Sequence, residues 1–203
     1  MTPFRIALAA AFALSLTPAL AQNPSIATAR ATVKTMSADG ATLNVRTRAG
    51  EDQTIHLTPK TRFVLVVPAK LADVKAGDFI GVAALPGEGG ELKAMEVHIF
   101  PESMRGTGEG FRPFDLAPKS SMTNGNISAR VDAASGPKLT VTYKGGEQTI
   151  VVDPNTPIVA LEPGKKAELK PGANIIARGP KQANGSIDAA FVLVGKDGLV
   201  PPM

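Results

Sequence analysis

The chain repeats itself at one fixed spacing. The triplet Gln53-Thr54-Ile55 recurs as Gln148-Thr149-Ile150, and the hexapeptide at 72–77 (Ala-Asp-Val-Lys-Ala-Gly) has a counterpart at 167–172 (Ala-Glu-Leu-Lys-Pro-Gly). Both matches, and single ones such as Ile80 with Ile175, share an offset of 95 residues. A fixed offset over so many positions indicates that one structural unit is encoded twice. We place the two copies at 25–99 and 122–197, with a linker at 100–121 and a tail at 198–203.

Each copy predicts short strands separated by turns. From Thr42 to Arg46, apolar and polar residues alternate with a period of two, which is typical of a half-buried strand with Leu43 and Val45 inside. Residues 69–75 instead have the spacing of one or two helical turns, ended by Gly77. The 20 Gly and 17 Pro argue against long helices. The expected strands cover 32–36, 42–46, 54–57, 62–67, 78–85 and 92–99 in the first copy, and 125–131, 138–143, 148–152, 156–161, 173–179 and 187–194 in the second.

This strand pattern predicts an all-β fold. Five or six short strands with one short helix midway are typical of a small closed barrel, because closure leaves no strand edge unpaired. The run from Arg62 to Val67 is nearly continuous in apolar residues, as in a strand covered on both faces. We therefore expect two tandem small OB-like barrels, each with one short helix. The position of the helix favours an OB-like over an SH3-like barrel, and a β-sandwich is the alternative.

Two motifs of the first copy resemble a known family. The hairpin Asp39-Gly40-x-x-Leu43-x-Val45 and the stretch Leu-x-Asp-Val-Lys-x-Gly-Asp at 71–78 are similar to a bacterial exported family of unknown function, which implies small OB-like β-barrel domains. The segment 97–110 (VHIFPESMRGTGEG) resembles a proteobacterial subgroup often labelled as a metal ABC transporter permease. Because a permease requires several membrane helices, that resemblance implies at most association with an uptake system. It implies no catalytic residues.

The first 21 residues predict an export signal. A positive start at 1–5 precedes an apolar run at 6–16, which is too short to span a bilayer. Pro18 breaks this run, and Ala19-Leu20-Ala21 matches a small-x-small cleavage site. We therefore expect cleavage after Ala21 and a mature periplasmic or secreted protein with no transmembrane segment.

Composition excludes several classes of protein. The chain has no Cys, which rules out disulfides, thiolate metal sites and cysteine nucleophiles. Its 22 basic and 18 acidic side chains are interspersed, which indicates a mixed surface rather than a polyanion groove. Few aromatic residues fall on the expected strands, so nucleic-acid binding by base stacking is not predicted. The chain contains no G-x-S-x-G nucleophile elbow, and we expect a protein that is not an enzyme.

The linker at 100–121 is the main candidate for function. It holds three phenylalanines together with Arg105 and Arg112. Exposed Phe is unfavourable in a flexible chain, so we expect these rings to be buried. Either they pack between the two barrels and fix their relative angle, or the linker docks on an envelope protein with Phe and Arg as anchors. The second interpretation predicts a binding or scaffolding protein without a cofactor, and its candidate partner-binding residues are Phe100, Arg105, Phe111, Arg112 and Phe114.

The alternative function is that of a metal-handling accessory protein of an envelope transport system. Imidazole and thioether groups suit a transition metal such as copper or zinc, and His98 lies near Met104 and Glu102 in the sequence. However, the chain has neither a His-x-His nor a Met-x-Met spacing. Both histidines, His56 and His98, alternate with apolar residues and are predicted on outward, exposed strand faces.

Overall fold

The computed structural model describes residues 25–133 and 136–203, in which all regular structure is β-strand or short 3₁₀ turn. The predicted all-β class is confirmed, while the predicted export signal at 1–21 lies outside the described residues. The strands are β1 (Ile26–Met36), β2 (Thr42–Thr47), β3 (Asp52–Ala69), β4 (Phe79–Pro86), β5 (Leu92–Ile99), β6 (Gly110–Pro113), β7 (Ser121–Ala133), β8 (Gly136–Tyr143), β9 (Gly146–Val151), β10 (Ile158–Pro163), β11 (Asn174–Pro180) and β12 (Ile187–Gly195). The 3₁₀ turns are η1 (Leu71–Asp73), η2 (Glu88–Gly90), η3 (Glu102–Met104), η4 (Lys166–Glu168) and η5 (Lys196–Gly198).

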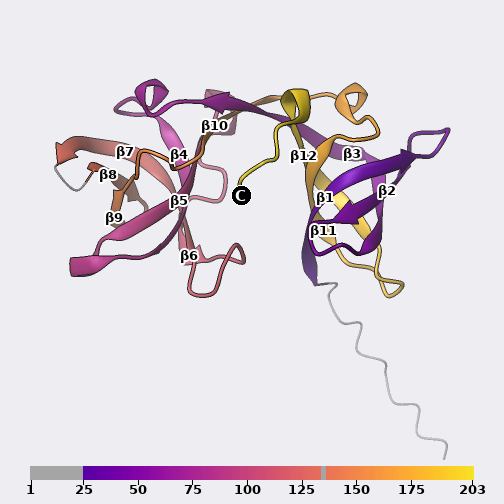
Figure 1. Ribbon diagram of the computed structural model, residues 1–203, viewed down its shortest axis with the longest axis horizontal. Helices are drawn as coiled ribbons and strands as arrows, with labels where there is room; N and C mark the ends of the chain where they lie inside the picture. The colour runs from indigo at the N-terminus through magenta and orange to yellow at the C-terminus, as the bar shows by residue number, and fades with distance from the viewer. Residues whose placement is uncertain (1–24, 134–135) are drawn as a thin grey trace, which may run out of the picture.

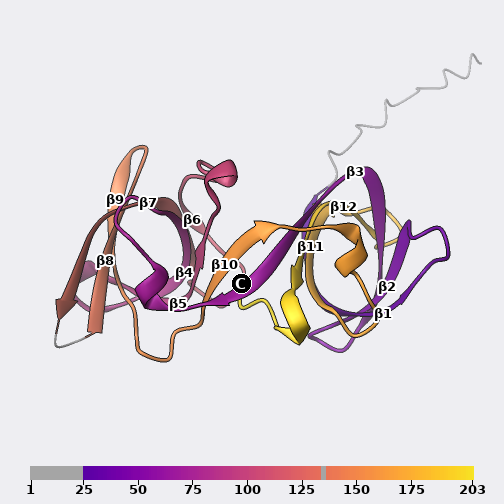
Figure 2. The same cartoon turned by 90° about the horizontal axis from the view of Figure 1, so that it is seen from above.

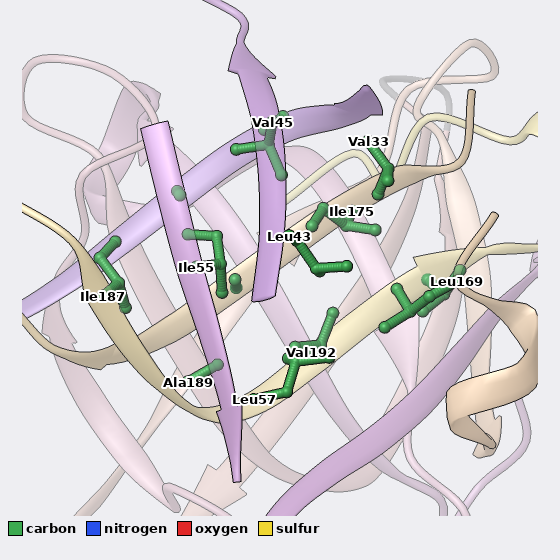
Figure 3. Close-up of a cluster of buried hydrophobic side chains, with 14 residues drawn as sticks. Val33, Leu43, Val45, Ile55, Leu57, Leu169, Ile175, Ile187, Ala189 and Val192 are labelled. Atoms are coloured by element: carbon green, nitrogen blue, oxygen red, sulfur yellow. The ribbon is translucent and has the colours of Figure 1, made fainter. Parts of the chain in front are cut away.

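Five strands form a closed barrel, which we call the first barrel (Figure 1). β1 pairs with β2, β2 with β3, β3 with β12, β12 with β11, and β11 returns to β1. All these pairs are antiparallel except β3 with β12, which run parallel over eight residue pairs. Alternate residues point inward, and Leu43, Val45 and Ile55 are fully buried in one core (Figure 3). The inward positions predicted from the alternation are therefore confirmed.

A second set of five strands, which we call the second strand ring, pairs in the order that corresponds to that of the first barrel (Figure 2). β7 pairs with β8, β8 with β9, β9 with β5, β5 with β4, and β4 returns to β7. The parallel contact of β5 with β9 is only two residue pairs long. Its core has fully buried side chains at Ile80, Val97, Leu139 and Ile150.

Neither core is built from a single repeat. The first barrel combines β1–β3 of the first copy with β11 and β12 of the second, and the second strand ring combines β7–β9 of the second copy with β4 and β5 of the first. The boundaries predicted for two tandem barrels, 25–99 and 122–197, therefore do not delimit the packed units. The physical reason is that both copies present the same inward pattern, so either copy can complete the other's core.

The exchange is made by two crossing strands. β3 continues past the first barrel, and its last residues pair antiparallel with β10, from Val64 with Pro163 to Ala69 with Ile158. Phe63 packs on the core of the first barrel, whereas Val64 and Val66 lie in a third core between the two strand sets. In this stretch one face of β3 is buried and the other, with Phe63, Leu65 and Val67, is half-buried, so the burial on both faces that the apolar run predicts is only partly reached.

The third core, which we call the junction core, fixes the two strand sets against each other. Its buried members come from β3 and β10, from β4, β11 and β12, from the linker, and from the chain end near the C label in Figure 1: Val64, Val66, Phe79, Phe100, Val159, Leu161, Ile176, Leu193 and Met203. Burial of this many apolar side chains stabilises one relative placement of the two sets.

The predicted short helices are single 3₁₀ turns. In η1 the backbone N–H of Lys70 donates to Asp73 at 2.8 Å, and in η4 the N–H of Lys165 donates to Glu168 at 2.7 Å. The residue after each turn, Val74 or Leu169, is buried in a core. Each turn therefore serves as a plug that closes one end of a strand set. None of the helical segments in the described ranges is long and apolar enough to cross a membrane.

Candidate functional site

The linker at 100–121 is an ordered part of the fold. It leaves β5 at Phe100, forms η3, and then runs as β6, which pairs antiparallel with the first residues of β7. The turn after β6 is closed by Ser120, whose hydroxyl oxygen lies 2.9 and 2.7 Å from the carbonyl oxygens of Phe114 and Ala117 and can donate its one proton to either. The predicted linker therefore contains a strand that the sequence pattern did not indicate, because β6 is only four residues long.

Phe100 is an interior residue. Only 9% of its surface is exposed, and its ring lies 5.2 Å from that of Phe79 and 4.9 Å from the imidazole of His98. These contacts place it in the junction core. Phe100 therefore holds the two strand sets together, as the packing interpretation predicts.

Phe114 and Asp115 attach the linker to the first barrel. The Arg30 guanidinium of β1 donates to both carboxylate oxygens of Asp115, at 2.7 and 3.2 Å, and lies over the Phe114 ring at 5.6 Å from its centroid. Hydrogen bonds from Arg30 hold the pKa of the Asp115 carboxyl below its usual range. Arg30 also donates from Nε to the carbonyl of Met203 at 3.0 Å. One arginine therefore joins the linker, β1 and the chain end.

Phe111 differs from the other two linker phenylalanines. It lies on β6 with 46% of its surface exposed, so the prediction that all three rings are buried is wrong for this residue. Among the described strands, β6 pairs with β7 alone, which leaves its other backbone edge open. Phe111 thus stands on an edge strand that has a neighbouring strand on one side only.

Arg112 follows Phe111 and is half-buried. It donates to the carbonyl of Gly108 at 2.7 Å, which folds the turn before β6 onto the strand. Burial, and to a lesser extent the charge of Arg178, lowers the pKa of Arg112. The effect of Arg178 indicates that a guanidinium from the first barrel lies near this end of the linker.

Arg105 is held by groups of its own protein. It donates to both oxygens of Glu102, each at 2.7 Å, to the side chain of Asn126, and to the carbonyl of Gly77 at 3.2 Å. This pairing raises the pKa of Arg105 and lowers that of Glu102. Both side chains are therefore engaged in fixing η3 to the second strand ring.

His98 lies in a buried polar cluster. It is 5% exposed, so the prediction of an exposed outward face is wrong: the residue points away from the core of the second strand ring, but the junction covers that face. Its Nδ1 lies 3.1 Å from an oxygen of Glu96, which is fully buried and also accepts the N–H of Ala83 at 3.2 Å. The carboxylate therefore has two partners, as burial requires.

Gly81 makes room for this cluster. A Cβ at position 81 would lie 2.1 Å from Nε2 of His98 and 2.7 Å from Oδ1 of Asn124, which is closer than van der Waals contact allows. Asn124 donates to the carbonyl of Thr107 in the linker at 2.9 Å, while its Oδ1 has no hydrogen-bond partner within the described part of the chain. The sequence signal for this cluster was available in Glu96-x-His98, because residues two apart in a strand share one face.

Each of the three residues proposed for a metal has other contacts in the structure. His98 is paired with Glu96, Glu102 is paired with Arg105, and Met104 packs against the junction core. The second histidine, His56, is half-buried on β3, with Nδ1 3.4 Å from the Thr42 hydroxyl. Within residues 25–133 and 136–203, no three or more His, Asp or Glu side chains are grouped so that they could hold a metal ion.

Comparison with known proteins identifies one family for part of the chain. A domain of unknown function (DUF5666) matches residues 124–192, about a third of the chain. The match confirms one part of the predicted resemblance, namely that the chain is similar to a family of unknown function. The matched segment extends from β7 to β12 and contributes strands to both cores. No curated protein and no solved structure matches the chain.

Proposed function

We propose that this chain is a non-enzymatic binding protein of the bacterial envelope that recognises a protein partner through β6. The observation that carries the proposal is Phe111, a large aromatic side chain 46% exposed on a strand with an open edge. Exposed aromatic residues are over-represented as binding anchors, and open edges accept a further strand from a partner. The remaining linker residues supply the rigid support that such an anchor needs.

The fold is consistent with this role. We propose that each strand set is an OB-type barrel with exchanged halves, because a five-stranded ring with one parallel closure and a plug between its third and fourth strands follows that plan. Because the two copies exchange halves, the two strand sets are connected by the paired strands β3 and β10. β6 is an additional strand that pairs with β7 at the side of this arrangement. The predicted export signal places the protein in the periplasm or outside the cell, where an envelope partner would be met.

Comparative capture tests the proposal. The tagged mature chain is used to capture partners from envelope extract, alongside Phe111→Ala and the control Val131→Ala, which removes an exposed apolar side chain of β7 (58% exposed). We expect a protein that the wild type and the control retain and Phe111→Ala loses, with unchanged circular dichroism in all three. Equal recovery by Phe111→Ala would show that β6 is not the binding surface.

A further inference from the structure

An outward-facing row of side chains crosses the first barrel beside the junction. The strand register aligns Arg62 of β3 with Phe191 of β12, and Phe191 with Arg178 of β11. The residues that precede or follow them along each strand pack in the core of the first barrel, so this row points outward. Both arginines are exposed, and Phe191 is half-buried against the junction core.

The linker brings a third arginine, Arg112, to the same region. Arg30 lies on β1 opposite Ile176, two residues from Arg178 along β11, and it binds Asp115, which is three residues from Arg112. Diagonal neighbours on adjacent strands lie roughly 7–8 Å apart, so the ion pair places the end of the linker beside Arg178. In accordance with this placement, the charge of Arg178 contributes to the lowered pKa of both Asp115 and Arg112.

The positive charge of this surface is not balanced from within. Among the described residues, Arg62, Arg112 and Arg178 form no ion pair, and the one carboxylate shown to lie beside them, Asp115, is bound in bidentate fashion by Arg30. Guanidinium groups gathered in this way repel one another and favour a bound anion, above all a carboxylate that they can grip through two N–H groups.

We infer that the segment recognised at β6 is an acidic, extended stretch of the partner protein, whose carboxylates are bound by Arg112 and Arg178, with Arg62 at the far end of the row. This inference rests on the proposed function and names the chemistry of its partner. Arg62 and Arg178 flank Phe191 on strands two positions apart, roughly 10 Å from each other. Carboxylates on alternate residues of an extended chain, roughly 7 Å apart, can reach both through flexible side chains.

A nucleic acid fits this surface less well. Affinity for a polynucleotide comes largely from the number of phosphates that a protein neutralises, and the three arginines without an ion pair can neutralise only three. Phe191 packs against the junction core, so its ring is not free to stack on bases. A short acidic peptide therefore matches both the number of charges and the open strand edge.

The experiment measures fluorescence anisotropy of a labelled peptide, (Glu-Thr)₆, with the full mature chain. The matched probes are (Gln-Thr)₆, which has no charge, and an oligothymidine of twelve nucleotides. We expect binding of (Glu-Thr)₆ alone, weakened about tenfold by either Arg178→Gln or Arg112→Gln because each removes a charged hydrogen-bonding partner. Arg46→Gln is the control, since Arg46 is exposed on β2 and already paired with Asp52.

Three results would overturn the inference: no binding of (Glu-Thr)₆, equal binding of (Gln-Thr)₆, or tighter binding of the oligothymidine. Repeating the envelope capture with Arg178→Gln and Arg112→Gln separates this inference from the proposed function. If Phe111→Ala loses the partner and the arginine variants keep it, the binding role stands and the acidic partner is excluded. If all variants keep the partner, the proposed function itself fails.

Discussion

The first barrel and the second strand ring share their inner faces and differ in their outer ones. At the offset of 95 residues, inward positions are apolar in both sets, and some carry the same residue, as in Ile55 with Ile150 and Val97 with Val192, all of them fully buried. Outward positions next to the junction differ: Gly81 corresponds to Ile176, Glu96 to Phe191, and His98 to Leu193. The comparison shows that both copies can retain apolar inward residues while their outward residues differ in size, polarity and charge.

The physical reason is the difference in surroundings. Inward side chains are enclosed in a close-packed apolar core in both sets, so a polar residue or a large change of volume is costly in either. The outward face of the second strand ring is covered by the linker and contains the buried Glu96–His98 pair, whereas the corresponding row of the first barrel includes the exposed Arg178. The two strand sets also differ in the parallel pair that closes each of them. The first barrel is closed by eight residue pairs between β3 and β12, and the second strand ring by two residue pairs between β5 and β9.

The largest effect is expected at the polar cluster. Glu96→Ala should lower the free energy of unfolding by about 3–5 kcal/mol, because His98 would lose its partner inside the junction. The double variant Glu96→Met/His98→Leu should cost much less, since apolar side chains can replace a buried pair. Urea denaturation measures both. A loss below about 1 kcal/mol for Glu96→Ala would mean that the pair adds little to stability.

A somewhat smaller effect is expected when equivalent core residues are truncated. Ile55→Ala and Ile150→Ala should each cost about 2–5 kcal/mol, because each removes a fully buried side chain from one of the cores. Since each core contains strands of both copies, calorimetry should show a single unfolding transition that shifts in either variant. Two separate transitions, with only one of them moved, would contradict the exchange of halves and support independent barrels.

The smallest effect concerns the attachment of the linker. Hydrogen bonds from Arg30 lower the pKa of Asp115 from 3.8, so the folded state is favoured while this carboxyl is ionised. Its contribution is fully present above about pH 4 and disappears as pH falls through the lowered pKa. With 59% of the side chain exposed, solvent limits the contribution to about 1 kcal/mol or less.

Comparing wild type with Asp115→Asn between pH 7 and pH 2.5 measures this contribution. The stability difference should shrink as the medium becomes acidic, and Glu88→Gln, an exposed change on η2, should show no such trend. A difference between wild type and Asp115→Asn that is constant over the whole range would exclude the ion pair as its cause.

Much of the local structure was predictable from the sequence. The expected strand at 92–99 coincides with β5, and the inward positions Leu43 and Val45 are fully buried. Two other expected strands, 54–57 and 62–67, are one continuous strand, β3, because the residues between them continue the extended backbone. Alternation and turn residues therefore located the elements, but they could not show where a strand continues without apolar alternation.

The candidate site was predicted only in part. The sequence pointed to the linker, yet it could not distinguish its three phenylalanines. In the structure Phe100 lies in the junction core, Phe114 contacts Arg30, and Phe111 is exposed. The row formed by Arg62, Phe191 and Arg178 was not predicted, because it exists only when β3 of one copy lies beside β12 of the other.

By itself, the sequence determined a duplicated strand plan, with its inward residues, its turns and a linker rich in phenylalanine. Local alternation decides these features, and it is the same in both copies. Only the tertiary structure decided which half completes which core and which outward faces are covered. Two identical inward patterns leave that choice open, and packing at the junction, where β3 pairs with β10, resolves it.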